Sequence, residues 1–286
     1  MLDPAADRPT LGVRPIERTS DLSDLPVYMT ALAISGGIFL ALWPVSLWLR
    51  DVGVVDAWWA PGFGVAVGAV WLLAGQPADI RALLVLCLVA AWSVRLSFVM
   101  VRRWRRHDGE DRRYRLIRKG WGASFWWKSL FIVFVLQGFL QWVVALGAMS
   151  GLLASPAPIG LFAVVGAALA LIGLAVETVA DAQLDAFKRS APEGALMTTG
   201  LRAYVRHPNY SGEMVFWWGV WLIVAPIAPW WAVVSPVVLT VLLTRVSGAP
   251  MLAETLGASR PEFAGYANRT PAFIPRLFAK NQIATE

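Results

Sequence analysis

The feature that most constrains the fold is a series of long apolar stretches separated by short polar segments. Each stretch approaches the roughly 20 apolar residues that a helix needs to cross a bilayer core. The composition agrees, with 57% hydrophobic residues, 15% charged residues and a mean hydropathy of +0.58. We therefore predict an all-α polytopic membrane protein with seven transmembrane helices. The predicted spans are 27–49, 54–75, 82–101, 127–150, 157–179, 212–229 and 231–247.

The chain divides into a polar N-terminal tail, residues 1–26, and a single membrane domain, residues 27–286. No basic segment precedes the first span and no small-residue cleavage site follows it, so a removable signal peptide is not expected. Cys87 is the one cysteine and lies inside an apolar run, which excludes a disulfide framework. Two well-separated histidines do not make a multi-histidine metal site, so we expect no metal.

The distribution of basic residues predicts the orientation of the domain. Of the 25 Lys and Arg residues, ten lie in 102–128, four in 180–211 and five from Arg245 onward. By the positive-inside rule these segments are cytoplasmic, with the N-terminus outside and the C-terminus inside. The net charge of +6 is therefore mainly an orientation signal, and we expect no nucleic-acid partner.

Charged residues within apolar spans are costly in a bilayer and usually face a cavity or a partner. Asp56, Arg95, Glu177 and Glu213 are such residues, and all lie in the cytoplasmic half of their spans. Simpler interpretations exist for two of them, because Arg95 could extend its guanidinium to the surface and Asp56 could pair with Arg50. A cavity open to the cytoplasm would satisfy all four together.

The fifth span continues into the polar stretch ETVADAQLDAFK. Glu177, Asp181 and Asp185 are four residues apart and lie along one helical face. One interpretation is the solvated face of an emerging helix. The alternative is that Asp181 holds a ribose hydroxyl or an amide of a bound cofactor.

The stretch YVRHPNYSGE, residues 204–213, places polar groups directly before the apolar run of the sixth span. Pro208 disfavours a helical residue before it, and Asn209 or Ser211 is expected to cap the next helix. Glu213 is expected in the first turn of that helix, where the dipole favours an acid. A capped helix start is therefore the simplest interpretation of this stretch.

A helix cap does not explain three basic or titratable side chains in and beside this stretch, namely Arg202, Arg206 and His207. Arginine forks, a histidine and a helix N-terminus together favour binding of phosphate or carboxylate. We therefore expect these side chains to hold the phosphates of a cofactor.

Several ordered blocks resemble a known family. They are VDAWWAPGF, GEDRRY, FWWKSLFIVFVLQG, ADAQLDAFK, GLRAYVRHPNYSGE and RPEFAGYANRTPAFIP. Over most of residues 50–276 the chain resembles bacterial membrane proteins of unknown function whose C-terminal half is similar to steroid 5-alpha-reductase. The shorter pattern R-H-P-x-Y is also similar to sterol reductases, to isoprenylcysteine carboxyl methyltransferases and to phospholipid methyltransferases.

The resemblance implies a seven-helix reductase in the bacterial inner membrane, with NADPH bound from the cytoplasm. Asp56 is similar in place to an acid that orients a substrate carbonyl. The cofactor residues implied by the resemblance are Asp181, Asn209, Gly212, Tyr266 and Arg269. One departure concerns a tyrosine of the third span in the steroid enzymes, because residues 82–101 contain no Tyr and Arg95 is their one strong polar group.

The expected activity is NADPH-dependent reduction of a C=C bond in a lipid or steroid-like substrate taken from the bilayer, with membrane lipids as the other partners. Asp56 or Arg95 would polarise the substrate, and Tyr210 or Glu213 would donate the proton. The first alternative is a methyltransferase that uses S-adenosylmethionine on a lipid or prenyl substrate. The second alternative is a non-catalytic lipid-binding membrane protein.

Overall fold

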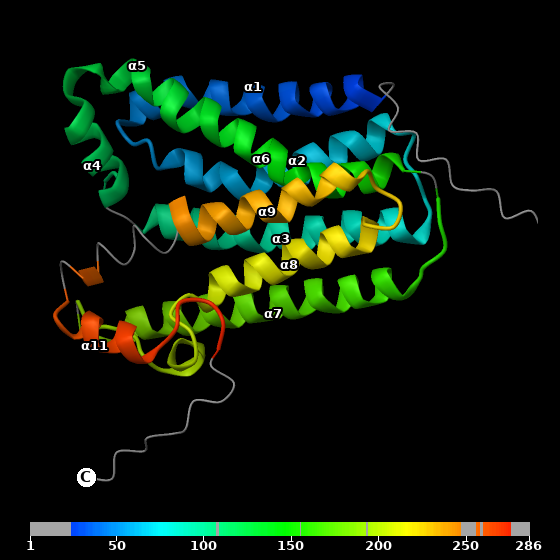
Figure 1. Ribbon diagram of the computed structural model, residues 1–286. Helices are drawn as coiled ribbons and strands as arrows, with labels where there is room; N and C mark the ends of the chain where they lie inside the picture. Colours follow the sequence, from blue (N-terminus) through cyan, green and yellow to red (C-terminus); the bar gives the residue numbers. More distant parts are fainter. Residues whose placement is uncertain are drawn as a thin grey trace, which may run out of the picture.

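The computed structural model describes residues 24–106, 109–154, 156–192, 194–246, 256–257 and 260–275. All regular structure in these residues is helical, and the long helices lie side by side in one bundle (Figure 1). Most of the predicted N-terminal tail, residues 1–26, lies outside the described residues.

Five helical segments are long and apolar enough to cross a membrane, which confirms the prediction of an all-α membrane protein. They are α1 (Leu25–Leu49), α2 (Val54–Leu73), α3 (Ile80–Arg105), the unit Arg112–Leu153 and α7 (Leu161–Ser190). The sixth and seventh predicted spans correspond to α8 (Pro208–Val224) and the helical segment Trp230–Val246. Because α8 has 17 residues, it extends only about 26 Å at about 1.5 Å per residue, somewhat less than a bilayer core of about 30 Å.

The unit Arg112–Leu153 changes direction within its length. Its first helix, α4 (Arg112–Trp121), is capped by the Asp111 carboxylate, which accepts a hydrogen bond from the Arg113 amide at 2.9 Å. Figure 1 shows α4 running across the end of the bundle instead of along it. Three segments then lead back along the bundle: α5 (Phe125–Ser129), the π-helical turn η3 (Leu130–Val135) and α6 (Leu136–Leu153).

Helices α7 and α8 approach each other closely because glycines lie at their crossing. A Cβ atom on Gly173 would lie 2.5 Å from the Gly212 carbonyl oxygen, and one on Gly212 would lie 2.6 Å from the Gly173 carbonyl oxygen. Neither position can therefore hold a larger residue without separation of the helices. The close approach places Glu177 of α7 next to the helix that carries Glu213.

Helix α7 is longer than the predicted span at 157–179, because the stretch ADAQLDAFK continues the helix to Ser190. Helix α8 also begins earlier than the predicted 212. His207 is its N-cap residue and Pro208 occupies its first position, which suits a proline because no amide donor is needed there. The predicted capping by Asn209 or Ser211 is wrong, and Glu213 lies in the second turn instead of the first.

An aromatic cluster fills the core between α2, α3 and α8. The Phe63 ring lies 5.3 Å from the Trp92 ring and 5.0 Å from the Trp217 ring, measured between centroids. Phe216 stacks on Trp92 at 5.6 Å. All four side chains are fully buried, so this cluster is a closely packed part of the core.

Candidate functional site

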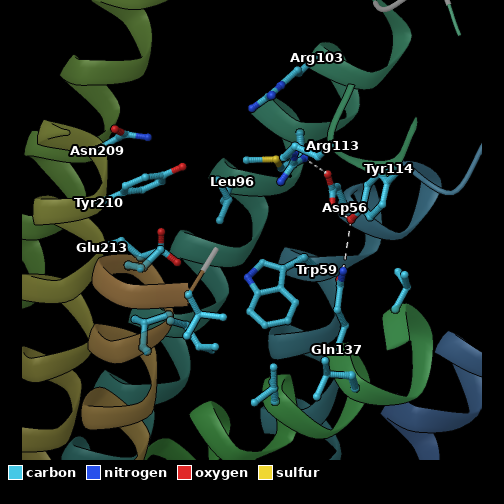
Figure 2. A pocket seen from close by; sticks show the side chains of 18 of the residues that line it. Asp56, Trp59, Leu96, Arg103, Arg113, Tyr114, Gln137, Asn209, Tyr210 and Glu213 are labelled. Atoms are coloured by element: carbon cyan, nitrogen blue, oxygen red, sulfur yellow. Dashed lines mark hydrogen bonds and ion pairs between the residues drawn. The ribbon is translucent and has the colours of Figure 1, made fainter. Parts of the chain in front are cut away.

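A cavity of about 330 Å³ lies within the bundle, toward the end that carries α4. Its size is at the lower end of the roughly 300–1,000 Å³ typical of small-molecule sites. We refer to it as the chamber. Its apolar lining includes Trp59, Leu96, Ile132, Leu136, Leu140, Leu239, Leu242 and Leu243. Polar side chains line it on two opposite sides, with Trp59 and Leu96 between them (Figure 2).

The first polar side, which we name the α2–α4 wall, is a hydrogen-bonded group around Asp56. The Asp56 carboxylate accepts hydrogen bonds from Arg113 at 2.5 Å and from the Tyr114 hydroxyl at 2.6 Å. The Gln137 amide donates to the Tyr114 oxygen at 3.2 Å. Asp56 therefore does not pair with Arg50, and the interpretation as an interfacial pair of these two residues is wrong.

The second polar side, the α7–α8 wall, carries Glu177, Asp181, Asn209, Tyr210 and Glu213. Glu177 and Glu213 are buried, with 2% and 7% of their surface exposed. The side chains of Asn209, Tyr210 and Glu213 lie together on α8, facing the Asp56 group across the chamber (Figure 2). Both of the predicted proton donors and two of the predicted cofactor residues therefore line one cavity with Asp56.

Arg95 of α3 binds two acids of the α7–α8 wall on the side away from the chamber. Its guanidinium donates to a Glu177 carboxylate oxygen at 2.5 Å, to the Glu177 backbone carbonyl at 2.9 Å and to the Asp181 carboxylate. The Trp92 indole donates to the other Glu177 carboxylate oxygen at 3.0 Å. Arg95 thus points inward, so the interpretation that it reaches for the membrane surface is wrong. It is not among the residues that line the chamber.

Glu213 is the unpartnered acid of this wall. Its carboxylate makes no hydrogen bond or ion pair with any residue that the structure describes, whereas those of Glu177 and Asp181 both contact the Arg95 guanidinium. Glu213 is therefore the acid of this wall whose carboxylate is available to a ligand in the chamber.

Residues 200–207, which precede α8 and which we name the basic loop, are held by the C-terminal strap, which we define as residues 271–273. The Arg206 amide donates to the Pro271 carbonyl at 2.8 Å, and the His207 amide to the Ala272 carbonyl at 3.0 Å. The Ser211 hydroxyl donates to the Phe273 carbonyl at 2.8 Å. These bonds fix the backbone that enters α8.

His207 packs between two aromatic rings. Its imidazole lies 5.6 Å from both the Tyr210 ring and the Phe273 ring, and 2% of the residue is exposed. Burial, and then the charges of Arg202 and Arg206, lower the pKa of His207 to about 4. The imidazole is therefore neutral at neutral pH and supplies no positive charge for the predicted phosphate site.

Cations gather around this loop. The positive charges of Arg103, Arg202 and Arg260 lie close enough to Lys188 to repel its ammonium group. Buried Nε atoms of Arg202, Arg206 and Arg260 have no hydrogen-bond partner among the described residues. Arg202 also donates to the Arg206 carbonyl at 2.8 Å. Repelling cations with unused donors form an environment that favours a polyanion such as phosphate.

The remaining predicted cofactor residues have structural contacts of their own. Gly212 lies at the crossing of α7 and α8. Tyr266 of α11 (Glu262–Arg269) is buried and donates its hydroxyl to the Arg202 carbonyl at 2.6 Å, so it positions the basic loop. Arg269 ends α11 on the surface. None of these three lines the chamber.

The prediction of site residues missed Arg103, Arg113 and Tyr114, which line the chamber. The last two lie in the block GEDRRY, which reads as an ordinary basic loop. The ten residues of α4 are too few and too polar for a periodic signal that would mark these two as inward-facing.

Comparison with protein families matches residues 42–270 to the family described as "Protein of unknown function (DUF1295)". Comparison with curated proteins and with solved structures gives no match. The matched range contains every residue of the chamber and of the basic loop. The chain therefore belongs to the DUF1295 family, whose function is unknown.

Proposed function

We propose that this protein is an NADPH-dependent reductase of a C=C bond in a lipid or steroid-like substrate. The observation that carries the proposal is one cavity lined by Asp56, Asp181, Asn209, Tyr210 and Glu213 beneath a cluster of cations. An apolar chamber with few convergent polar groups is typical of sites for hydrophobic ligands. The resemblance of the surrounding blocks to steroid 5-alpha-reductase supports the same chemistry by analogy.

The proposal includes seven membrane crossings and a cytoplasmic basic end. Helix α8 and the segment Trp230–Val246 would add two short crossings to the five long ones. The ends of α3 and α7 that carry Arg102, Arg103, Lys188 and Arg189 lie at the same end of the bundle as α4 (Figure 1). Basic residues concentrated at one end favour a cytoplasmic position for that end, where NADPH is available.

The residues around the loop fit the anionic part of NADPH. Arg202, Arg206 and Arg260 have unused donors, and Lys188 and Arg103 add charge. Asp181 and Asn209 line the chamber on the α7–α8 wall, where they would hold a ribose hydroxyl or the carboxamide. When bound, NADPH would supply the hydride for the reduction.

The two walls would have different roles in the reaction, polarisation of the substrate and delivery of the proton. On the α2–α4 wall, Asp56 accepts hydrogen bonds and so orients Arg113 and Tyr114, and the remaining N–H groups of Arg113 would polarise a substrate carbonyl conjugated to the double bond. On the α7–α8 wall, Glu213 would deliver the proton through its position beside Tyr210. Arg95 would act indirectly, because it holds Glu177 and Asp181 in place.

Thermal-shift titration of the detergent-purified chain with NADPH, NADH and S-adenosylmethionine tests the cofactor. We expect the largest rise in the unfolding temperature with NADPH, because ligands stabilise the state that binds them. Stabilisation by S-adenosylmethionine alone would support the methyltransferase alternative and reject the reductase. No shift with any of the three would favour a lipid-binding protein without catalysis.

The variant Arg206→Gln tests the phosphate site. If Arg206 contacts the 2′-phosphate, affinity for NADPH should fall about tenfold or more while affinity for NADH changes little. Arg189→Gln is the matched control, since Arg189 is exposed and pairs with Asp185 at 3.5 Å. Equal losses for both nucleotides would place Arg206 away from the 2′-phosphate.

A further inference from the structure

Helix α4 has an inner and an outer face with different tasks. Its inner face supplies Arg113 and Tyr114 to the chamber. Its outer face carries Arg112, Arg115 and Lys119, which are three and then four residues apart and therefore lie on one side of the helix. All three are exposed, and none forms an ion pair with a carboxylate of the described residues.

Large apolar side chains are exposed along the same unit. Leu116 is 57% exposed, Trp121 45% and Trp126 57%. The Lys128 ammonium lies 4.1 Å from the centre of the Trp121 ring. Tryptophans and cations together are typical of the interface between headgroups and hydrocarbon. Since α4 runs across the end of the bundle (Figure 1), its outer face has the orientation of an in-plane interfacial helix.

A hollow lies beside this surface, between the end of α1 and α5. It is lined by Ser46, Leu47, Arg50, Arg118 and Trp126. The Arg118 guanidinium is neutralised by Glu110 at 2.7 Å and 2.9 Å. Arg50 lies just past the end of α1, is exposed and forms no ion pair within the described part of the chain. The hollow therefore combines a free cation, a tryptophan edge and an aliphatic side chain.

We propose that the outer face of α4 and this hollow bind the headgroup of an anionic phospholipid of the surrounding bilayer. The phosphate would lie among Arg50, Arg112 and Arg115, with the acyl chains along the exposed side chains of α5 and η3. The chemistry of the surface selects this occupant, because free cations call for an anion and exposed tryptophans call for the membrane interface. The inference does not depend on the proposed reductase activity.

A consequence follows for the chamber. A lipid bound to the outer face would hold α4 against the bundle, and α4 carries two of the four polar groups of the α2–α4 wall. Anionic lipid should therefore raise the unfolding temperature of the whole chain, since a ligand of the native state stabilises it.

The test compares phosphatidylglycerol with phosphatidylcholine of the same acyl chains, added to the detergent-purified full chain. Native mass spectrometry measures the apparent Kd of each lipid, and thermal unfolding measures its stabilising effect. We expect wild type to bind phosphatidylglycerol more tightly. Each basic residue near an anionic surface contributes about fivefold in affinity. The double variant Arg112→Gln/Arg115→Gln should therefore raise the apparent Kd of phosphatidylglycerol about thirtyfold and leave that of phosphatidylcholine unchanged.

The matched control is Arg105→Gln/Arg189→Gln, which removes two exposed cations at the same end of the bundle but outside α4. It should leave the affinity for phosphatidylglycerol within about twofold of wild type. No preference for phosphatidylglycerol in wild type would overturn the proposal, as would equal losses in the two double variants. Competition by soluble glycerol 3-phosphate at the same concentration would also overturn it, because the surface would then select phosphate and not lipid.

Discussion

The two walls of the chamber differ in the number of donors that their carboxylates have. On the α2–α4 wall, Asp56 alone receives hydrogen bonds from Arg113 and Tyr114. On the α7–α8 wall, Glu177 and Asp181 share Arg95, and Glu213 has no hydrogen-bond partner among the described residues. The first wall supplies two donors to its one lining acid, and Arg113 also pairs with Asp111 behind it. The second wall has three acids and one cation, which contacts two of them.

This difference indicates different roles. A carboxylate with two donors holds those donors in fixed directions, and the remaining N–H groups of Arg113 suit the orientation of a substrate oxygen. A carboxylate without a partner can contact a ligand directly, which suits general acid chemistry. The chamber would therefore orient a substrate on one side and protonate it from the other.

Removal of the cation should have very different costs on the two walls. Arg95→Met leaves Glu177 and Asp181 buried without a counter-charge, and we expect a loss of about 3–5 kcal/mol of stability. Arg113→Met should cost about 1 kcal/mol, because Arg113 and Asp56 are partly exposed, at 35% and 29%, and both partners keep another donor. Tyr114 still donates to Asp56, and Arg103 still pairs with Asp111. Chemical or thermal unfolding in detergent measures both losses.

The variant Arg95→Met/Glu177→Gln serves as the control for this pair. It removes one of the uncompensated charges and should recover part of the loss. A loss for Arg113→Met as large as that for Arg95→Met would show that the two walls do not differ in charge balance.

The acids of both walls could be found from the sequence, but most of their partners could not. Asp56, Arg95, Glu177 and Glu213 are conspicuous because each interrupts an apolar span, where an unpaired charge is costly. The spans themselves follow from the length of the apolar runs, so the five long helices match prediction closely.

The partners Arg113 and Tyr114 lie in a polar segment whose composition is that of a surface loop. Their inward direction depends on how α4 crosses the end of the bundle, which is a property of tertiary packing and leaves no periodic signal in ten residues. The start of α8 was missed for a related reason, because the C-terminal strap, which lies more than 60 residues away in sequence, binds the backbone at Arg206 and His207.

The α7–α8 wall also depends on the close approach of its two helices. Gly212→Ala would place a Cβ atom 2.6 Å from the Gly173 carbonyl oxygen and 2.8 Å from the Glu177 amide nitrogen. Because both neighbours are backbone, the helices must separate, and we expect a loss of about 1–3 kcal/mol. The unfolding temperature in detergent measures this loss.

Gly68→Ala on α2 is the matched control, since no atom lies within 4 Å of its added Cβ. It should leave the unfolding temperature unchanged or slightly higher, as alanine favours a helix over glycine. Equal destabilisation by the two substitutions would show that helix propensity or general packing, and not the α7–α8 approach, is responsible.

The stability of the protein should depend on pH through His207, the residue directly before α8. Its folded pKa of about 4 lies below the ordinary value of 6.5, so between these values the unfolded state binds more protons. Stability should therefore fall as the pH is lowered through this window, by about 2 kcal/mol between pH 7 and pH 5. His207→Phe keeps a ring between Tyr210 and Phe273 and should remove this part of the pH dependence. Unfolding temperatures of both proteins at the two pH values test it, and parallel declines would contradict it.

The smallest expected effect comes from two tyrosines that line the chamber on opposite walls. The Tyr114 hydroxyl bonds to both Asp56 and Gln137, so Tyr114→Phe should cost about 1–2 kcal/mol of stability. The Tyr210 hydroxyl makes no hydrogen bond with the described residues, so Tyr210→Phe should change stability by less than about 0.5 kcal/mol. If the Tyr210 hydroxyl passes the proton from Glu213 to the substrate, Tyr210→Phe should lower the turnover rate instead. The reverse order of stability losses would mean that the α7–α8 wall, and not the α2–α4 wall, is the one held by hydrogen bonds.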